Sequence, residues 1–284
     1  MNKLCLVFLI GFLVNCSNYG QLTFVTKLPK KLDENSGIVS MEDSKIWVIE
    51  DNGNPDNIYE VGFNGDLLKE FKVSNAKNKD WEDLTKDEEG NLYIGDMGNN
   101  DNDRKDLVIY KIPNPVNEPG DKIEAEEIRY YYPEQKEFPP DAKNFIYDAE
   151  ALFHSGGALF VITKNGARPF NGQAMVYKIP AQAGNHKAQL VSAISLCGEP
   201  HSCRVTGAAA SPDQKTVVLL GYGKIWVFTD FKANVFTEGS MRTIDLGATT
   251  QLEAVCFMND STLLISDEQS HGTGRNLYSY SLGN

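Results

Sequence analysis

The feature that most limits what this chain can fold into is a pattern that recurs five times along it. The copies start 46, 68, 56 and 47 residues apart, at Ser36-Gly37, Glu82-Asp83, Glu150-Ala151, Thr206-Gly207 and Glu253-Ala254. Self-similarity at roughly 40 to 50 residues is typical of the blades of a β-propeller. The alternative is five unrelated hairpins in a sandwich, but such hairpins have no reason to repeat in register.

Each copy contains the same succession of strand-like segments. A turn rich in Gly, Asp, Asn or Ser separates the first two strands, and apolar and polar residues alternate on both sides of it. We expect second strands at 45–49, 91–95, 159–163, 216–220 and 262–266, and third strands at 57–61, 107–112, 174–179, 224–229 and 276–281.

An outer strand completes each copy except the last. The outer candidates are 67–73, 127–132, 188–196 and 241–246, whereas residues 22–28 (LTFVTKL) form a spare strand before the first copy. Pairing 22–28 with 276–281 would close a ring and remove an exposed edge. We therefore predict an all-β fold: one β-propeller over residues 20–284, with five four-stranded blades closed by an N-terminal strand. Six blades are the alternative.

Residues 1–16 have the pattern of an export signal. One Lys precedes the apolar run LCLVFLIGFLV, which is too short to span a bilayer and is followed at once by polar residues. Leu13-Val14-Asn15-Cys16 resembles a lipobox, although Asn15 replaces the usual small residue. Two outcomes stay open, a lipoprotein with lipid on Cys16 or ordinary cleavage. Both predict an exported protein: periplasmic, attached to the outer membrane, or secreted.

The charge excludes some partners. The chain has 27 basic and 39 acidic residues and a formal net charge of −12. Such a surface repels phosphate backbones and anionic lipids, so we expect neither nucleic acid nor membrane binding, apart from the lipid anchor. We therefore expect a monomer that binds a small polar ligand, a carbohydrate or a protein partner.

The cysteines agree with export. Cys197 and Cys203 frame the short loop CGEPHSC, so a disulfide is expected in an oxidising compartment. A metal site of Cys197, His201 and Cys203 is the alternative, but it lacks a fourth ligand. Cys256 lies in the apolar segment AVCFM and is predicted to be a buried thiol.

The blade motifs also carry a resemblance. DWEDL with GNLYIGDMGNN and IYKIPNP, DAEAL with LFVITK, and VTGAAASPDQKTVVLLGY resemble those of a broad family of exported bacterial β-propeller proteins, mostly hypothetical. More distantly they resemble the calcium-binding propellers called SdiA-regulated or phytase-like. The resemblance covers most of the mature chain and implies the fold, but propellers host lactonases, phosphatases, glycosidases and binding proteins alike. The phytase and gluconolactonase groups use six blades, which puts transfer of their catalytic residues in doubt.

The repeat also predicts a site. In a blade the first strand is innermost and the second is antiparallel to it, so the start of the first and the end of the second lie at the same face. Polar residues from both sets should line one axial mouth, with Arg168 on a loop at its rim. The predicted ligand-binding residues are Glu82, Asp83, Glu150, Lys164, Arg168, Glu253 and Asp267.

Several of these residues are carboxylates, which suggests a metal. Like carboxylates close together raise one another's pKa unless a cation offsets them, and calcium prefers oxygen ligands. We predict a calcium site formed by Glu82, Asp96, Glu150 and Glu253. The alternative is that these carboxylates cap backbone amides at the mouth, with residues 96–103 (DMGNNDND) as a solvated turn.

Two functions follow from these features. The first is an exported propeller that binds a small polar ligand and a divalent cation in its axial funnel. The second is a calcium-assisted hydrolase of a phosphoester, lactone or glycoside, with Glu82 or Glu150 as base. The sequence favours the first, because it contains no GxSxG, HExxH, P-loop or Rossmann motif and no identifiable nucleophile with an orienting partner.

Overall fold

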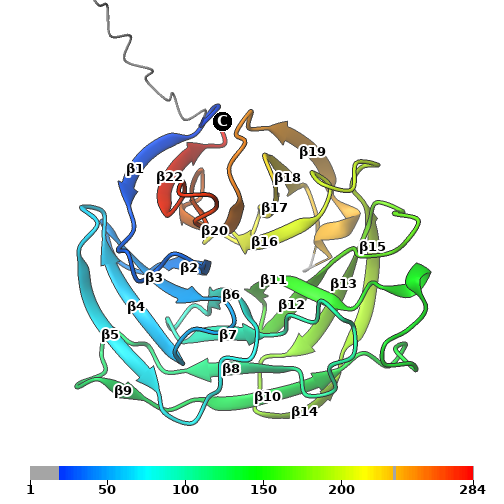
Figure 1. Ribbon diagram of the computed structural model, residues 1–284, viewed down its shortest axis with the longest axis horizontal. Coiled ribbons are helices and arrows are strands. Elements are labelled where there is room, and N and C mark those ends of the chain that lie inside the picture. The colour runs from blue at the N-terminus through cyan, green and yellow to red at the C-terminus, as the bar shows by residue number, and fades with distance from the viewer. Residues whose placement is uncertain (1–18, 233–234, 284) are drawn as a thin grey trace, which may run out of the picture.

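The chain folds into a ring of five antiparallel sheets. The computed structural model describes residues 19–232 and 235–283, and within these ranges nearly all regular structure is β-strand. Figure 1 shows the sheets arranged around one axis, with β2, β6, β11, β16 and β20 nearest the centre. The predicted five-bladed propeller is therefore confirmed, and the six-bladed alternative is wrong.

The strand bounds follow the five sequence copies closely. The first blade contains β2 (Asn35–Ser40), β3 (Lys45–Glu50), β4 (Asn57–Gly62) and β5 (Leu67–Val73). The second contains β6 (Trp81–Lys86), β7 (Leu92–Asp96), β8 (Val108–Ile112) and β10 (Glu126–Tyr131). The third contains β11 (Asp148–Ser155), β12 (Ala158–Lys164), β13 (Gln173–Pro180) and β15 (Gln189–Ser195).

The last two blades use the remaining strands. The fourth contains β16 (Val205–Ala210), β17 (Val217–Gly221), β18 (Lys224–Thr229) and β19 (Ser240–Asp245). The fifth contains β20 (Leu252–Asn259), β21 (Thr262–Asp267), β22 (Asn276–Ser281) and β1 (Thr23–Lys27). Two short 3-10 helices, η1 (Ala142–Asn144) and η2 (Phe236–Glu238), lie in connections.

The ring closes through the predicted pairing of the N-terminal strand with the last strand. β1 pairs antiparallel with β22, with Thr23 opposite Ser279 and Lys27 opposite Asn276. β1 is thus the outermost strand of the last blade, and Figure 1 shows the two strands side by side. Pairing the first strand with the last leaves β22 without a free edge.

Two short strands were not anticipated. β9 (Lys122–Ile123) leaves the second blade to pair in parallel with β5 of the first, and β14 (Gly184–Lys187) leaves the third to pair with β10 of the second. Neither has an apolar alternation, so local pattern could not reveal them. Each links a blade to the outer edge of the blade before it.

The hydrophobic core is divided among the blades. The described residues form five buried clusters, each between two neighbouring blades. Between the first and second blades, for example, Trp47 and Phe71 lie in one cluster with Trp81. Each sheet therefore buries apolar side chains on both faces, as packing against two neighbours requires.

The three cysteines among the described residues behave as predicted. Cys197 and Cys203 form a disulfide, with their Cα atoms 5.4 Å apart, and Cys256 is a buried free thiol. The predicted signal segment 1–16, including Cys16, lies outside the described residues. Of the helices in the described ranges, none has the length and apolarity needed to cross a membrane.

Candidate ligand and cation site at the axial mouth

The five polar residues that start the sequence copies share one backbone feature. In every blade the pairing of the two innermost strands skips one residue: Trp81 lies opposite Asp96 and Asp83 opposite Gly95, which leaves Glu82 in a β-bulge. The same skip occurs at Ser36, Glu150, Thr206 and Glu253. A bulge re-aims a side chain out of the ladder, and here it directs five polar side chains to one mouth.

These five residues line a common cavity of about 210 Å³. Its lining is strongly acidic, because it includes six carboxylates and one cation, Lys164. The lining residues are Glu34, Asn35, Ser36, Asp51, Glu82, Asn100, Glu150, Lys164, Thr206, Tyr222, Gln251, Glu253 and Glu268. The structure therefore brings together four of the seven predicted ligand-binding residues, namely Glu82, Glu150, Lys164 and Glu253.

Two of the bulge residues are not acidic, and they join neighbouring blades. The Ser36 hydroxyl donates to the Trp81 carbonyl oxygen at 2.8 Å, and the Thr206 hydroxyl donates to the Leu252 carbonyl oxygen at the same distance. In each case the acceptor precedes the acidic bulge residue of the next blade. The hydroxyls thus fix where Glu82 and Glu253 leave the backbone.

Asp83 lies deeper on the axis than the cavity. The equivalent residues of the other blades are Gly37, Ala151, Gly207 and Ala254, and a Cβ on Gly37 would lie 2.5 Å from the Leu84 nitrogen. Asp83 is fully buried, and its carboxylate accepts hydrogen bonds from the amides of Leu84, Leu152 and Ala208. Asp83, which was predicted to bind a ligand, therefore caps backbone amides and does not line the cavity.

The side of the cavity near the third and fifth blades is held by hydrogen bonds. Lys164 forms an ion pair of 3.0 Å with Glu150, while Tyr222 donates to Glu253 at 2.9 Å and Gln251 donates to the same oxygen at 2.9 Å. Burial disfavours the charged ammonium, but the charges of Glu150, Tyr222 and Glu253 outweigh it and raise the pKa of Lys164. Burial, reinforced by Glu150, raises the pKa of Glu253 to about 8.

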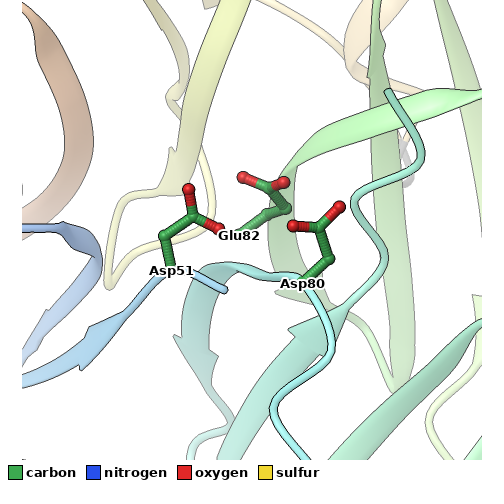
Figure 2. Close-up of side chains that lie close together, drawn as sticks. All are labelled: Asp51, Asp80 and Glu82. Carbon is green, nitrogen blue, oxygen red and sulfur yellow. The ribbon is translucent and has the colours of Figure 1, made fainter. Parts of the chain in front are cut away.

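A compact acidic cluster lies on the other side. Asp51 follows β3, Asp80 precedes β6 and Glu82 is the bulge residue of β6, and one carboxylate oxygen from each lies within 4.8 Å of the others. Figure 2 shows the three carboxylates close together at the adjoining ends of two blades. Hard cations such as calcium bind to oxygen clusters of this kind.

Glu82 has an unusual environment within this cluster. Its side chain is only 6% exposed, yet no group among the described residues donates a hydrogen bond or forms an ion pair with its carboxylate. Burial, together with the charges of Glu150 and Asp51, raises the pKa of Glu82 well above its ordinary value. Gly98 leaves the space that the cluster needs, because a Cβ there would collide with the Glu82 and Asp80 carboxylates.

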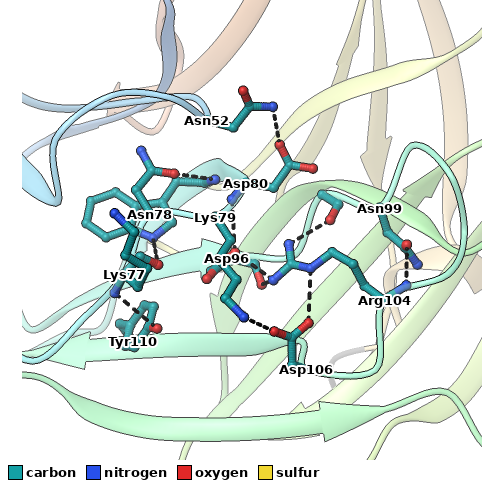
Figure 3. A network of polar contacts seen from close by, with 12 residues as sticks. Asn52, Lys77, Asn78, Lys79, Asp80, Asp96, Asn99, Arg104, Asp106 and Tyr110 are labelled. Atoms are coloured by element: carbon teal, nitrogen blue, oxygen red, sulfur yellow. Dashed lines mark hydrogen bonds and ion pairs between the residues drawn. The ribbon is translucent and has the colours of Figure 1, made fainter.

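Asp96 supports this cluster from behind. Its carboxylate accepts the Asp80 amide at 3.1 Å and pairs with Arg104 at 2.8 Å, and Arg104 also donates to the Gly98 carbonyl oxygen at 2.7 Å. Figure 3 shows this network beneath Asp80, whose own carboxylate accepts from Asn52 at 2.7 Å. Burial raises the pKa of Asp96 to about 6, although Arg104 opposes the shift. Asp96 therefore holds the backbone of the cluster and lies outside the cavity.

Two predicted site residues lie elsewhere. Asp267 is fully buried and accepts hydrogen bonds from the Asn276 amide and the Tyr278 hydroxyl, both at 2.7 Å, while Arg168 is exposed and does not line the cavity. Sequence reasoning missed Asp80 and Gln251 as site residues. Both lie just before a strand, since β6 begins at Trp81 and β20 at Leu252, so the alternation within the strands gave no signal for them.

Comparison with known proteins establishes the fold. No protein-family model matches the sequence, and no characterised protein matches it at the level of sequence. Among solved structures, the PQQ-bound aldose sugar dehydrogenase of Streptomyces coelicolor has a TM-score of 0.52 at 10% identity, covering 92% of this chain and 98% of that chain.

Two further solved structures are similar. A structural genomics protein of unknown function from Bacteroides thetaiotaomicron has a TM-score of 0.50 at 9% identity, covering 92% of this chain and 75% of that one. A virginiamycin B lyase from Staphylococcus aureus has a TM-score of 0.44 at 14% identity, covering 89% and 67%. These neighbours include β-propeller enzymes, and at such identities the likeness shows the fold alone.

Proposed function

We propose that this protein is an exported β-propeller that binds a divalent cation, calcium, and a small polar ligand at its axial mouth. The observation that carries the proposal is Glu82, which is only 6% exposed, lines the cavity without a hydrogen bond or ion pair to a described residue, and lies beside Asp51 and Asp80. A buried charge with no hydrogen bond is costly, and a bound cation would remove that cost. Export and a lipid on Cys16 remain part of the proposal on the grounds of the signal segment.

Three residues would hold the cation. Asp51, Asp80 and Glu82 together offer up to six carboxylate oxygens, and calcium takes roughly 6 to 8 oxygen ligands. The set differs from the one expected from the sequence, because Asp96 is paired with Arg104 and Glu150 with Lys164. Glu82 belongs to both sets, the one in the structure and the one predicted from the sequence.

The remaining lining would contact the ligand. On the side opposite the cluster, Lys164 has donors left beyond its pair with Glu150, whereas the donors of Tyr222 and Gln251 are taken by Glu253 and Glu268. The volume of about 210 Å³ is below the range of roughly 300 to 1,000 Å³ typical of drug-sized ligands. A ligand rich in hydroxyl groups, or one with a single anionic group that meets Lys164, matches this lining. The ligand class of the proposal is therefore a sugar-sized polar molecule.

One observation favours a second candidate, a calcium-assisted hydrolase. The pKa of Glu253 is about 8, so its carboxyl group carries a proton near neutral pH and could donate it to a leaving group. Hydrolysis of nitrophenyl esters, phosphates or glycosides that requires calcium and is lost in Glu253→Gln would support this candidate. Binding without turnover would support the first.

Calcium titration of metal-free protein tests the proposal. After removal of metal by a chelator, calcium at a hundredfold excess over its dissociation constant should stabilise the fold by about 2.7 kcal/mol. The double variant Asp80→Asn with Glu82→Gln should fold but lose this stabilisation, whereas Glu137→Gln, at an exposed position, should retain it. Equal melting temperatures of the wild type with and without millimolar calcium, and no heat in calorimetry, would show that the cluster does not bind calcium.

A further inference from the structure

A second cavity lies at the opposite end of the same five innermost strands. It has a volume of about 490 Å³, within the range of small-molecule sites. We call it the lower cavity. The acidic mouth lies where these strands begin, whereas the lower cavity is lined where they end, by 39–41, 84–86, 154, 208–210 and 255–257. The buried Asp83 carboxylate and its three backbone donors lie between the two.

Lys86 is the one lysine or arginine among the described residues that line the lower cavity, and it forms no ion pair, although Asp87, Glu88 and Glu89 line the same cavity. Its ammonium donates to the Ser40 carbonyl oxygen at 2.5 Å, and no carboxylate of the described residues forms an ion pair with it. An ammonium group has three donors, so two remain for another partner. Burial lowers the pKa of Lys86, as it does for an ammonium removed from water without a counter-charge.

The acids nearest in sequence do not neutralise Lys86. Asp87 is buried, and its carboxylate accepts from the Asn91 amide and side chain, both at 2.8 Å, and from the Tyr93 hydroxyl at 3.0 Å. Glu88 is exposed, and its Oε2 atom lies 3.7 Å from Nδ1 of His154. Glu89 also lines the cavity and is exposed, so Lys86 is half-buried without an ion pair to any of these three acids.

Part of the wall around Lys86 is apolar, while acidic and other polar side chains form the rest. Val39, Leu84, Ala209, Val255 and Phe257 line the lower cavity, and all five are nearly buried. Inorganic anions and sugars gain little from such walls, whereas an apolar group gains about 25 cal/mol for each Å² of surface removed from water. The apolar part of the wall thus favours a ligand with a hydrocarbon body.

We propose that the lower cavity binds a small organic anion, a monocarboxylate whose carboxylate pairs with Lys86 and whose apolar body packs against the walls. This site is separate from the calcium site and does not depend on it. In a chain with a formal net charge of −12, an unpaired ammonium in a cavity is the feature that would attract an anion.

Octanoate is a suitable probe, with octanamide as its neutral counterpart. In metal-free protein, titration calorimetry should show octanoate binding at least tenfold more tightly than octanamide. Lys86→Met keeps the apolar stem and removes the charge, so it should abolish this preference, whereas Lys136→Met, at an exposed position, should keep it. Equal affinity for the two probes in the wild type, or no binding of octanoate, would overturn the proposal.

The Cys256 thiol can report whether octanoate binds in the lower cavity. It lines the lower cavity as a free thiol, so bound octanoate should slow its modification by a small uncharged thiol reagent, as followed by peptide mass. Ala209→Leu, which fills the cavity without touching the Lys86 charge, should remove both the binding and the protection. Unchanged Cys256 modification at saturating octanoate, or full affinity in Ala209→Leu, would place the binding elsewhere and refute the site.

Discussion

Asp83 in the second blade accepts a hydrogen bond from the backbone amide of Ala208 in the fourth blade, 3.3 Å away and 125 residues later in the chain. The same oxygen accepts the Leu152 amide of the third blade at 2.7 Å. One carboxylate therefore joins three innermost strands on the axis. Glycine or alanine occupies the equivalent position of the other four blades, because the centre of a five-bladed ring has room for only one such group.

Replacing Asp83 should destabilise the whole ring. In Asp83→Ala the amides of Leu152 and Ala208 lose their acceptor in a buried place, which costs about 1 to 3 kcal/mol for each orphaned group. Urea unfolding measures the loss, and Asp101→Ala, at an exposed position, is the control. A change in Asp83→Ala no larger than in the control would mean that water reaches these amides.

Asp96→Asn should weaken calcium binding without removing a proposed ligand. Asp96 holds the Asp80 amide and Arg104, and loss of such supporting contacts typically costs 10- to 100-fold in metal affinity. Calcium titration of the variant beside Asp106→Asn, which alters the exposed end of the same network, measures the effect. Wild-type affinity in Asp96→Asn would indicate that Asp80 keeps its position unaided.

The stability of the metal-free protein should fall as pH rises from about 5 to 8. The folded-state pKa is about 8 for Glu253 and about 7 for Asp51, against roughly 4 for carboxyls in an unfolded chain, so the folded state holds protons that the unfolded state releases. The contribution of these protons to the free energy of unfolding is complete below the unfolded-state pKa, and it is lost as the pH rises through the folded-state pKa. Calcium would compete with the proton on Asp51, a proposed ligand, so its stabilising effect should grow over the same interval. Urea unfolding at four pH values with chelator or calcium measures both trends, and a metal-free stability that rises with pH would contradict the first.

Removing β1 should expose the edge of β22 and cause aggregation. A chain that begins at Pro29 lacks the partner of β22, and exposed edge strands associate with other chains. Light scattering and size-exclusion chromatography would compare it with a chain that begins at Tyr19. A monomeric, fully folded protein without β1 would show that the pairing is dispensable.

Breaking the disulfide should cost about 2 kcal/mol, as expected for a loop of this length. It should also disturb the axial mouth, because His201 within that loop stacks on Tyr222 with ring centroids 5.3 Å apart. The variant with Cys197→Ser and Cys203→Ser should therefore have a lower melting temperature than the wild type. Cys256→Ser is the control, because it removes a thiol without breaking a disulfide. Equal melting of the wild type and the double variant would make the bond energetically neutral.

The strands were predictable because each has a strong local pattern that recurs in register. The site was only partly predictable, since the sequence placed Glu82, Glu150, Lys164 and Glu253 at one mouth but could not show how far each side chain reaches. Asp96 illustrates this, because its pairing with Arg104 depends on the loop between β7 and β8. The β-bulges decide where these side chains point. The alternation of apolar and polar residues did not show which residue the strand pairing skips.

The pairing of β1 with β22 also orders events during synthesis. The fifth blade takes strands from both ends of the chain, so the ring cannot close before residues 276–281 have been made. Until then the fifth blade lacks β22, and β1 has no partner. Contacts between such distant segments slow folding, so the finished propeller is a property of the completed chain, and partial chains present open surfaces.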